Sequence, residues 1–403
     1  MSVLPAPPRL RRARTAVVTA FVVNGLVFAS VIARTPAIRD TLGLSPAQLG
    51  LLLLCVSTGA IAGLPLSGPI VQRFGAGAAV LGGSFSVALG LTGLGVGLLV
   101  ASVALVAPSL MLVGLGMGVW DVAMNVQGAD VERHLDRALM PRLHGMFSIG
   151  SVVGAGVGAL SAATGIPLAA QVLVMAVVAP VSMAWAVRRF LPQQATESGE
   201  ERPRRAGALT AWREPRTLAV GLMVLGFAFT EGSANDWMAV AMVDGYGTSE
   251  TVGAVGFGVF VSAMTIARFS GSAVLARFGR VATLRATAAL GLAGLLLVLL
   301  GGSVPVALAG ALLWGMGAAL GFPVGMSAAA DDESRAAVRV SVVSSIGYTA
   351  FLAGPPLIGL LAEHAGILRA LFVVVAALTL GLAAAGAARP LPAPAATTQP
   401  ARP

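Results

Sequence analysis

Residues 68–76 read Gly-Pro-Ile-Val-Gln-Arg-Phe-Gly-Ala, and residues 272–280 read Ser-Ala-Val-Leu-Ala-Arg-Phe-Gly-Arg. The shared Arg-Phe-Gly recurs after 204 positions, and the same spacing relates residues further upstream. The identical pairs are Asp40 and Asp244, Gly43 and Gly247, Ser45 and Ser249, Arg73 and Arg277, Phe74 and Phe278, and Gly75 and Gly279. Identities on a single spacing predict an internal duplication, so the chain should fold as two homologous halves.

Both halves are too apolar for a soluble domain. The 403 residues are 57% hydrophobic and 11% charged, with a mean hydropathy of +0.88, whereas soluble domains carry about 25% charged residues. This composition excludes a soluble enzyme, a disordered chain and a disulfide scaffold. Because the sequence has no nucleotide-binding loop, zinc-ligand spacing or nucleophile elbow, we expect no enzyme activity, no metal site and no cofactor.

Runs without charge predict twelve membrane spans, since a helix of about 20 apolar residues crosses a bilayer. The spans must be helices because lipid offers the backbone no hydrogen-bond partner. We therefore expect an all-α membrane protein with two pseudo-symmetric six-helix bundles. The expected parts are an N-terminal tail (1–14), a first bundle (15–187), a linker (188–217), a second bundle (218–388) and a disordered C-terminal tail (389–403).

The orientation follows from the basic residues, all of which are arginines. If both termini are cytoplasmic, 22 arginines lie on the inside, and only Arg34, Arg39 and Arg369 lie outside. Cytoplasmic loops carry such an excess of positive charge. We expect a monomeric multi-pass protein of the cytoplasmic (inner) membrane of a bacterium. The arginines are dispersed between apolar spans, which argues against a nucleic-acid partner.

The duplicated loop resembles the Gly-x-x-x-Asp-Arg-x-Gly-Arg motif of the major facilitator superfamily, and this resemblance extends over nearly the whole chain. The acidic position is Gln72 in the first copy and Ala276 in the second. Within the superfamily, residues 120–125 (Trp-Asp-Val-Ala-Met-Asn) and 143–150 (Leu-His-Gly-Met-Phe-Ser-Ile-Gly) resemble the fucose-permease-like and rhizopine-associated membrane protein subgroup. The resemblance implies alternating access, with spans 1, 4, 7 and 10 lining a central cavity. It assigns gating roles to the loop residues Arg73, Gly75, Arg277 and Gly279.

Polar side chains in three of these four spans are the candidate site. A charge at the bilayer centre costs about 2.5–3.5 kcal/mol on insertion scales, so each one needs a reason. Burial disfavours the charged form of a carboxylate, which suits Asp121 and Glu231 to proton coupling. The candidate solute-binding residues are Asn24, Trp120, Asn125, Asn235, Asp236 and Trp237. Arg268 in span 8 is a gating candidate, and it could instead form a structural ion pair with Glu231 or extend toward the membrane surface.

These features predict a secondary active transporter that uses the proton gradient to take up a small polar, sugar-like solute. Its partners would be the solute, protons and the lipid bilayer. One alternative is proton-antiport efflux of an amphipathic drug or metabolite, because Gly145, Gly154 and Gly158 partly match the superfamily's antiporter motif. A second alternative is a non-transporting membrane sensor on the same fold.

Overall fold

The computed structural model describes residues 8–135, 139–192, 208–332 and 335–391, and within them all regular secondary structure is helical. The helices before the linker are α1 (Pro8–Ile32), α2 (Thr35–Leu42), α3 (Pro46–Leu99), α4 (Val103–Leu135), α5 (Met140–Ala163) and α6 (Leu168–Val187). The later helices are α7 (Ala208–Ala211), α8 (Pro215–Tyr246), α9 (Glu250–Phe278), α10 (Arg280–Leu300), α11 (Val304–Ala318), α12 (Gly321–Ala329), α13 (Ala336–Ala365), α14 (Ile367–Ala370), α15 (Phe372–Ala384) and the 3₁₀ helix η2 (Ala385–Ala388).

The predicted all-α membrane fold is confirmed. Among the described residues, eleven helical segments are long and apolar enough to cross a membrane. One of them, α3, has 54 residues and contains two spans, because the chain runs from one into the next through Gly75. The helices therefore supply the twelve spans that the sequence predicts.

The duplication has a local structural cause at the first loop of each half. Gly43 and Gly247 both end a helix in the left-handed conformation, each with a φ of 63°. Two residues later, Ser45 and Ser249 cap the next helix by accepting a hydrogen bond from a backbone N–H. Glycine tolerates positive φ, and serine is a preferred N-cap, so both halves retain these residue types for the same turn.

The Arg-Phe-Gly loops are also built alike. Gly75 has φ 84° and ψ 158°, and Gly279 has φ 75° and ψ 167°. This backbone region is open essentially only to glycine. The guanidinium groups of Arg73 and Arg277 each lie 5.4 Å from the ring centroid of the following phenylalanine.

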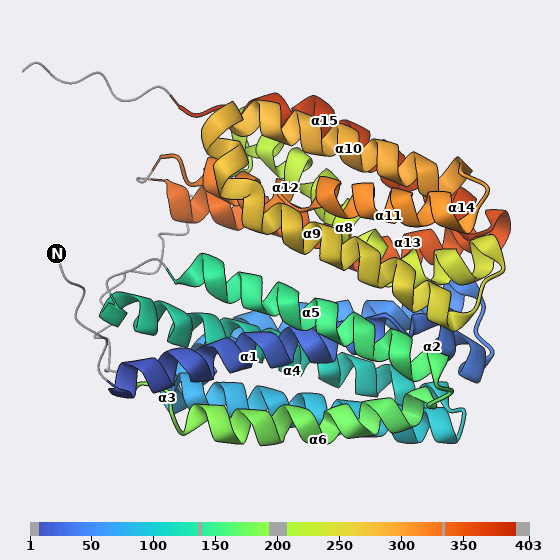
Figure 1. Ribbon diagram of the computed structural model, residues 1–403. Helices are drawn as coiled ribbons and strands as arrows, with labels where there is room; N and C mark the ends of the chain where they lie inside the picture. Colours follow the sequence, from blue (N-terminus) through green and yellow to red (C-terminus); the bar gives the residue numbers. More distant parts are fainter. Residues whose placement is uncertain (1–7, 136–138, 193–207, 333–334, 392–403) are drawn as a thin grey trace, which may run out of the picture.

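The two halves lie side by side, and their ribbons diverge toward the end of the molecule that carries the linker (Figure 1). We call this end the linker end and the other the Arg34 end. The halves meet through α3 against α13 and α5 against α9. At the Arg34 end the backbones approach closely, since a Cβ on Gly50 would lie 2.5 Å from the carbonyl oxygen of Pro355.

Helices extend into the expected N-terminal tail and into the expected linker. Helix α1 begins at Pro8, so part of the expected tail 1–14 is helical, as proline suits a first helical turn and arginine is a good helix former. The linker contains α7 and the beginning of α8. The disorder expected for 389–403 concerns mainly residues 392–403, which lie outside the described residues.

Candidate functional site

Glu231 stands at the middle of α8 and forms an ion pair with Arg268 of α9, with 2.8 Å between Oε1 and Nη2. The Glu231 side chain is 17% exposed and that of Arg268 is 30% exposed. Both side chains are therefore only partly buried, although most of α8 is buried. The sequence left open whether Arg268 pairs with Glu231, and the structure shows that it does.

A break in span 10 supplies a second acceptor to the same arginine. Pro323 has no backbone N–H, so the carbonyl of Ala319, four residues earlier, lacks its helical donor. Helix α11 ends at Ala318 and α12 begins at Gly321, which leaves this carbonyl in the gap. It accepts a hydrogen bond from Arg268 Nε at 3.4 Å. Interrupted helices of this kind form polar sites in membrane transporters.

Asp121 of α4 is exposed and interacts electrostatically with Tyr348 of α13, so it faces the opposite half. Asn125 donates from Nδ2 to the Asp121 backbone carbonyl at 2.8 Å and to Oδ1 at 3.4 Å. This arrangement confirms that the two side chains share one helix face. Among the described residues, Asp121 has no ion-pair partner, in contrast to Glu231.

Asn24 and Trp120 lie inside the first half. Asn24 is 3% exposed, and Trp120 is fully buried next to Gly83 of α3. The Asn24 amide nitrogen and the Trp120 indole nitrogen have no hydrogen-bond partner among the described residues. Two buried donors without acceptors cost free energy. In this conformation neither group is open to a solute.

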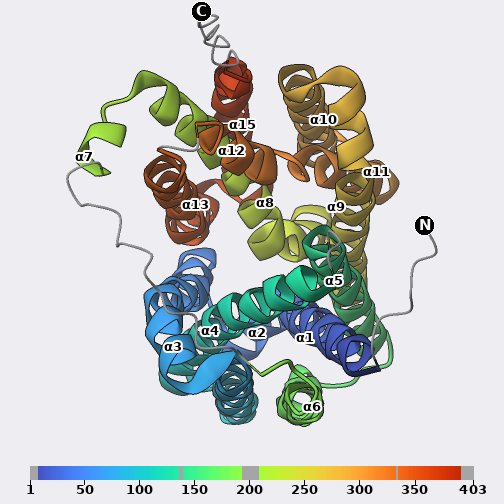
Figure 2. The ribbon, with the colours of Figure 1, turned by 90° about the vertical axis from the view of Figure 1, so that its left-hand side faces the viewer.

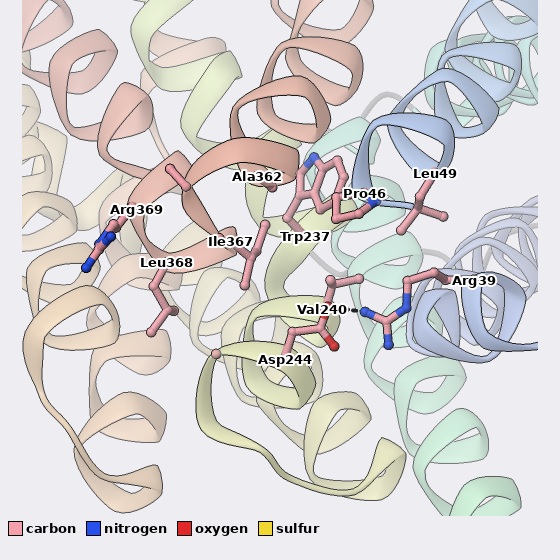
Figure 3. Close-up of a pocket in the computed structure, with 13 residues that line it drawn as sticks. Arg39, Pro46, Leu49, Trp237, Val240, Asp244, Ala362, Ile367, Leu368 and Arg369 are labelled. Atoms are coloured by element: carbon pink, nitrogen blue, oxygen red, sulfur yellow. Dashed lines mark hydrogen bonds and ion pairs between the residues drawn. The ribbon is translucent and has the colours of Figure 1, made fainter. Parts of the chain in front are cut away.

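The remaining candidates lie beyond Glu231 on α8, toward the Arg34 end. Asn235 and Asp236 are half-buried, and neither forms an ion pair or a side-chain hydrogen bond within the described part of the chain. Trp237 lines a cavity of about 310 Å³ with Arg39 and Asp244 (Figure 3). The structure thus separates Trp237 from the Glu231 carboxylate that the sequence grouped with it.

Arg34 joins the two halves at a sharp turn. Pro36 lies in the first turn of α2, which begins at Thr35, so α1 and α2 are separate helices with Arg34 between them. Arg34 is 3% exposed, and its guanidinium forms a two-pronged ion pair with Glu250 at the beginning of α9. It also donates to the Ile166 carbonyl at 3.2 Å and to the Gln171 side chain at 3.2 Å. Planar arginine–carboxylate pairs of this kind are strong and geometrically specific.

A second pair between the halves lies nearby, where Arg39 of α2 contacts Asp244 of α8 (Figure 3). Arg39 also donates to Asp40 at 2.6 Å. Asp40 and Asp244, which are equivalent positions of the two halves, therefore both contact Arg39. Burial lowers the pKa of Arg39, but the hydrogen bonds to Asp244 and Asp40 outweigh it and raise the pKa. The Glu363 carboxylate adds a third contact by accepting from the Ala47 N–H at 3.1 Å.

The ion pairs of the second half at the linker end stay within that half. Glu214 pairs with Arg335 and Arg339, and Arg339 also contacts Asp332 at 2.9 Å. Asp331 lies 2.8 Å from Arg216 and 2.6 Å from Arg280. At the Arg34 end, in contrast, the pairs Arg34–Glu250 and Arg39–Asp244 cross between the halves.

Sequence reasoning missed Arg34, Glu250 and Tyr348. One signal was present for Arg34, because Pro36 marks the turn at which Arg34 faces the opposite half. Tyr348 carries no such signal. Its position opposite Asp121 depends on how the two halves pack.

Comparison with known proteins places the chain in a family. Residues 15–332 match the Major Facilitator Superfamily. An uncharacterized MFS-type transporter of Yersinia pestis is 32% identical over 92% of this chain and 94% of its own length. The membrane protein MosC of Rhizobium meliloti is 29% identical over 90% of this chain and 86% of its own length.

Solved structures share the fold. The nucleoside transporter NupG has a TM-score of 0.77 at 12% identity, covering 94% of this chain and 100% of its own. The fucose:proton symporter FucP of E. coli has a TM-score of 0.63 at 15% identity, covering 94% and 98%. From the match along the chain and the identity to its bacterial relatives, the protein belongs to the major facilitator superfamily, whose transporters move solutes across membranes.

Proposed function

We propose that this secondary transporter couples the uptake of a small polar solute to proton entry. The observation that supports this most strongly is the Glu231–Arg268 ion pair, whose partly exposed charged groups lie in the middle of a membrane span. An apolar cargo would not require these charges, whose placement in a bilayer is costly. The asparagines and the Ala319 carbonyl would add hydrogen-bonding groups for hydroxyls of the solute.

In an alternating-access mechanism, the observed conformation would be one state of the transport cycle. If the linker end is cytoplasmic, as the arginine distribution indicates, the ion pairs of Arg34 and Arg39 close the outer side. The end at which the helices of the two halves diverge (Figure 1) would then lie on the cytoplasmic side.

Proton coupling would use the two carboxylates differently. Protonation of Glu231 removes the charge that holds Arg268 Nη2, which frees this nitrogen for the solute while Nε stays bonded to the Ala319 carbonyl. Asp121 lacks a cation to neutralise it among the described residues, so proton uptake is its means of becoming neutral during the conformational change.

Export of an amphipathic compound is the second candidate. Its sequence support is the glycine pattern of α5, and this pattern has a packing role. A Cβ on Gly154 would lie 2.3 Å from the Leu26 carbonyl oxygen, and one on Gly158 would lie 2.8 Å from the Ala33 Cβ just after the end of α1. Because close contact with α1 requires these glycines, we favour uptake.

A solute must first be found by its effect on thermal unfolding, using sugars, polyols, amino acids and antibiotics as the screen. The protein is then reconstituted in liposomes that contain a pH-sensitive dye. An inward solute gradient should drive proton entry in the wild type. Glu231→Gln should lose proton entry and accumulation while solute counterflow persists.

Asp130→Asn is the matched control, because this carboxylate pairs with Arg133 near the linker end. It should retain coupled uptake. Accumulation that survives in both Glu231→Gln and Asp121→Asn would show that proton coupling lies elsewhere. Outward pumping against the proton gradient would establish efflux, and solute binding without transport would establish a sensor.

A further inference from the structure

A cavity of about 1320 Å³ opens at the linker end of the first half, between the beginning of α1 and the end of α6. Figure 2 shows these two helices as neighbours at the periphery of that half. The cavity is separate from the Glu231 region, which belongs to the second half. Its charged lining residues are all arginines: Arg9, Arg12, Arg188 and Arg189.

No carboxylate of the described residues balances the positive charge of this cavity. In residues 8–135, 139–192, 208–332 and 335–391, none of the four arginines forms an ion pair with a carboxylate. Arg189 donates to the Trp185 carbonyl at 2.7 Å, and its guanidinium lies 4.0 Å from the Trp185 ring centroid. Like charges gathered in one cavity repel each other, so an anion bound among them would stabilise the arrangement.

The wall of the cavity continues into an apolar surface of α6. Val181, Ala184 and Trp185 line it, and the Val181 and Trp185 side chains are 62% and 43% exposed. Tryptophan gathers at the level of lipid headgroups. A ligand that fills this site therefore needs both an anionic head and apolar chains. A purely soluble anion would leave the apolar part of the wall uncovered.

We propose that the cavity binds an anionic phospholipid with two phosphates, the chemistry of cardiolipin. Arginine forks bind phosphate oxygens in pairs, so four arginines match two phosphates. Basic pockets at the ends of membrane helices are suited to such headgroups. The acyl chains would follow Val181 and Ala184, and the bound lipid would hold α1 against α6. This proposal does not depend on the transported solute.

Native mass spectrometry of the full-length protein, released from detergent with added lipid, tests this site. The wild type should bind one cardiolipin at least tenfold more tightly than phosphatidylglycerol or phosphatidylethanolamine. Arg12→Gln/Arg188→Gln should reduce cardiolipin affinity by at least tenfold. The control Arg11→Gln/Arg14→Gln removes the same charge from another face of α1 and should change affinity less than threefold.

Three results would overturn the proposal. Equal loss of binding in both double variants would mean general attraction to positive charge. Displacement of cardiolipin by inorganic pyrophosphate at equal concentration would assign the cavity to a soluble anion. Cardiolipin binding that appears only after Glu197, Glu200 and Glu201 are changed to Gln would assign it to the linker's own acids. Thermal unfolding of each variant near that of the wild type confirms that the loss is local.

Discussion

At the residue scale, Glu231 and Arg268 depend on each other for their position inside the membrane. Removing one partner leaves the other charged and poorly solvated, whereas removing both leaves two neutral polar groups. Because both side chains are partly exposed, we expect this penalty to be smaller than for a fully buried pair. The stability of variants therefore reports whether the pair is structural.

We expect Glu231→Gln and Arg268→Gln each to lower the free energy of unfolding by about 1–2 kcal/mol, and the double variant to recover at least half of this loss. Thermal unfolding in detergent measures the effect. Coupled uptake should stay absent in the double variant if Glu231 carries the proton. Recovery of uptake together with stability would reduce the pair to a structural role.

At the scale of single elements, proline and glycine decide where helices break, and polar groups gather at the breaks. Pro36 separates α1 from α2 and places Arg34 at the turn, and Pro323 frees the Ala319 carbonyl for Arg268. Gly75 and Gly279 carry the chain between spans in a conformation closed to other residues. The breaks are local in origin, and their polar groups acquire function only through distant partners.

The beginning of α8 is fixed by Glu214, and this contact should be sensitive to pH. Burial alone would raise the pKa of Glu214, but the hydrogen bonds from Arg339 and Thr217 and the nearby charges hold it below the ordinary value of 4.5. The ionised form therefore stabilises the fold fully above that value, and the contribution is lost as pH falls through the lowered pKa.

We expect the melting temperature of the wild type to fall as pH drops below the ordinary glutamate value, and Glu214→Gln to fall less over the same range. The variant should be less stable than the wild type at neutral pH, since it loses its pairs with Arg335 and Arg339. Scanning fluorimetry across a pH series measures both. Parallel curves for the two proteins would contradict a role for Glu214.

At the scale of the whole molecule, the contacts between the halves are unequal at the two ends. Arg34, Arg39 and Glu363 link the halves at the Arg34 end, where Gly50 also packs against the Pro355 backbone. Opening that end requires these links to break together. Their combined strength should therefore set the population of the conformation that is open at the Arg34 end.

A cysteine at position 49 can report this opening, because Leu49 is fully buried and lines the cavity of Figure 3. In a Cys55→Ser background, Arg34→Gln should raise the labelling rate of Leu49→Cys by a hydrophilic maleimide roughly tenfold, the effect of about 1.4 kcal/mol. Arg369→Gln, at another arginine of the same cavity, should leave the rate unchanged. Equal rates in Arg34→Gln and the parent would refute the closure by Arg34.

The sequence by itself determined the number of spans, the duplication and the family. These follow from local physics: apolar length sets each span, and Gly43, Ser45 and Gly75 recur because the same turns recur. It also identified Glu231, Asp121 and Arg268 as charges that need partners. A charged side chain inside an apolar span was enough to identify each of these three residues.

Only the tertiary structure decided which charges meet and which side chains are accessible. Arg34 and Glu250 are 216 positions apart, and Trp120 and Trp237 turned out to be fully buried rather than placed beside the polar pair. Such outcomes depend on how each helix is rotated and on which end of the molecule is closed. Packing between distant segments sets both the rotation and the closed end, and the residue pattern of a single span does not specify that packing.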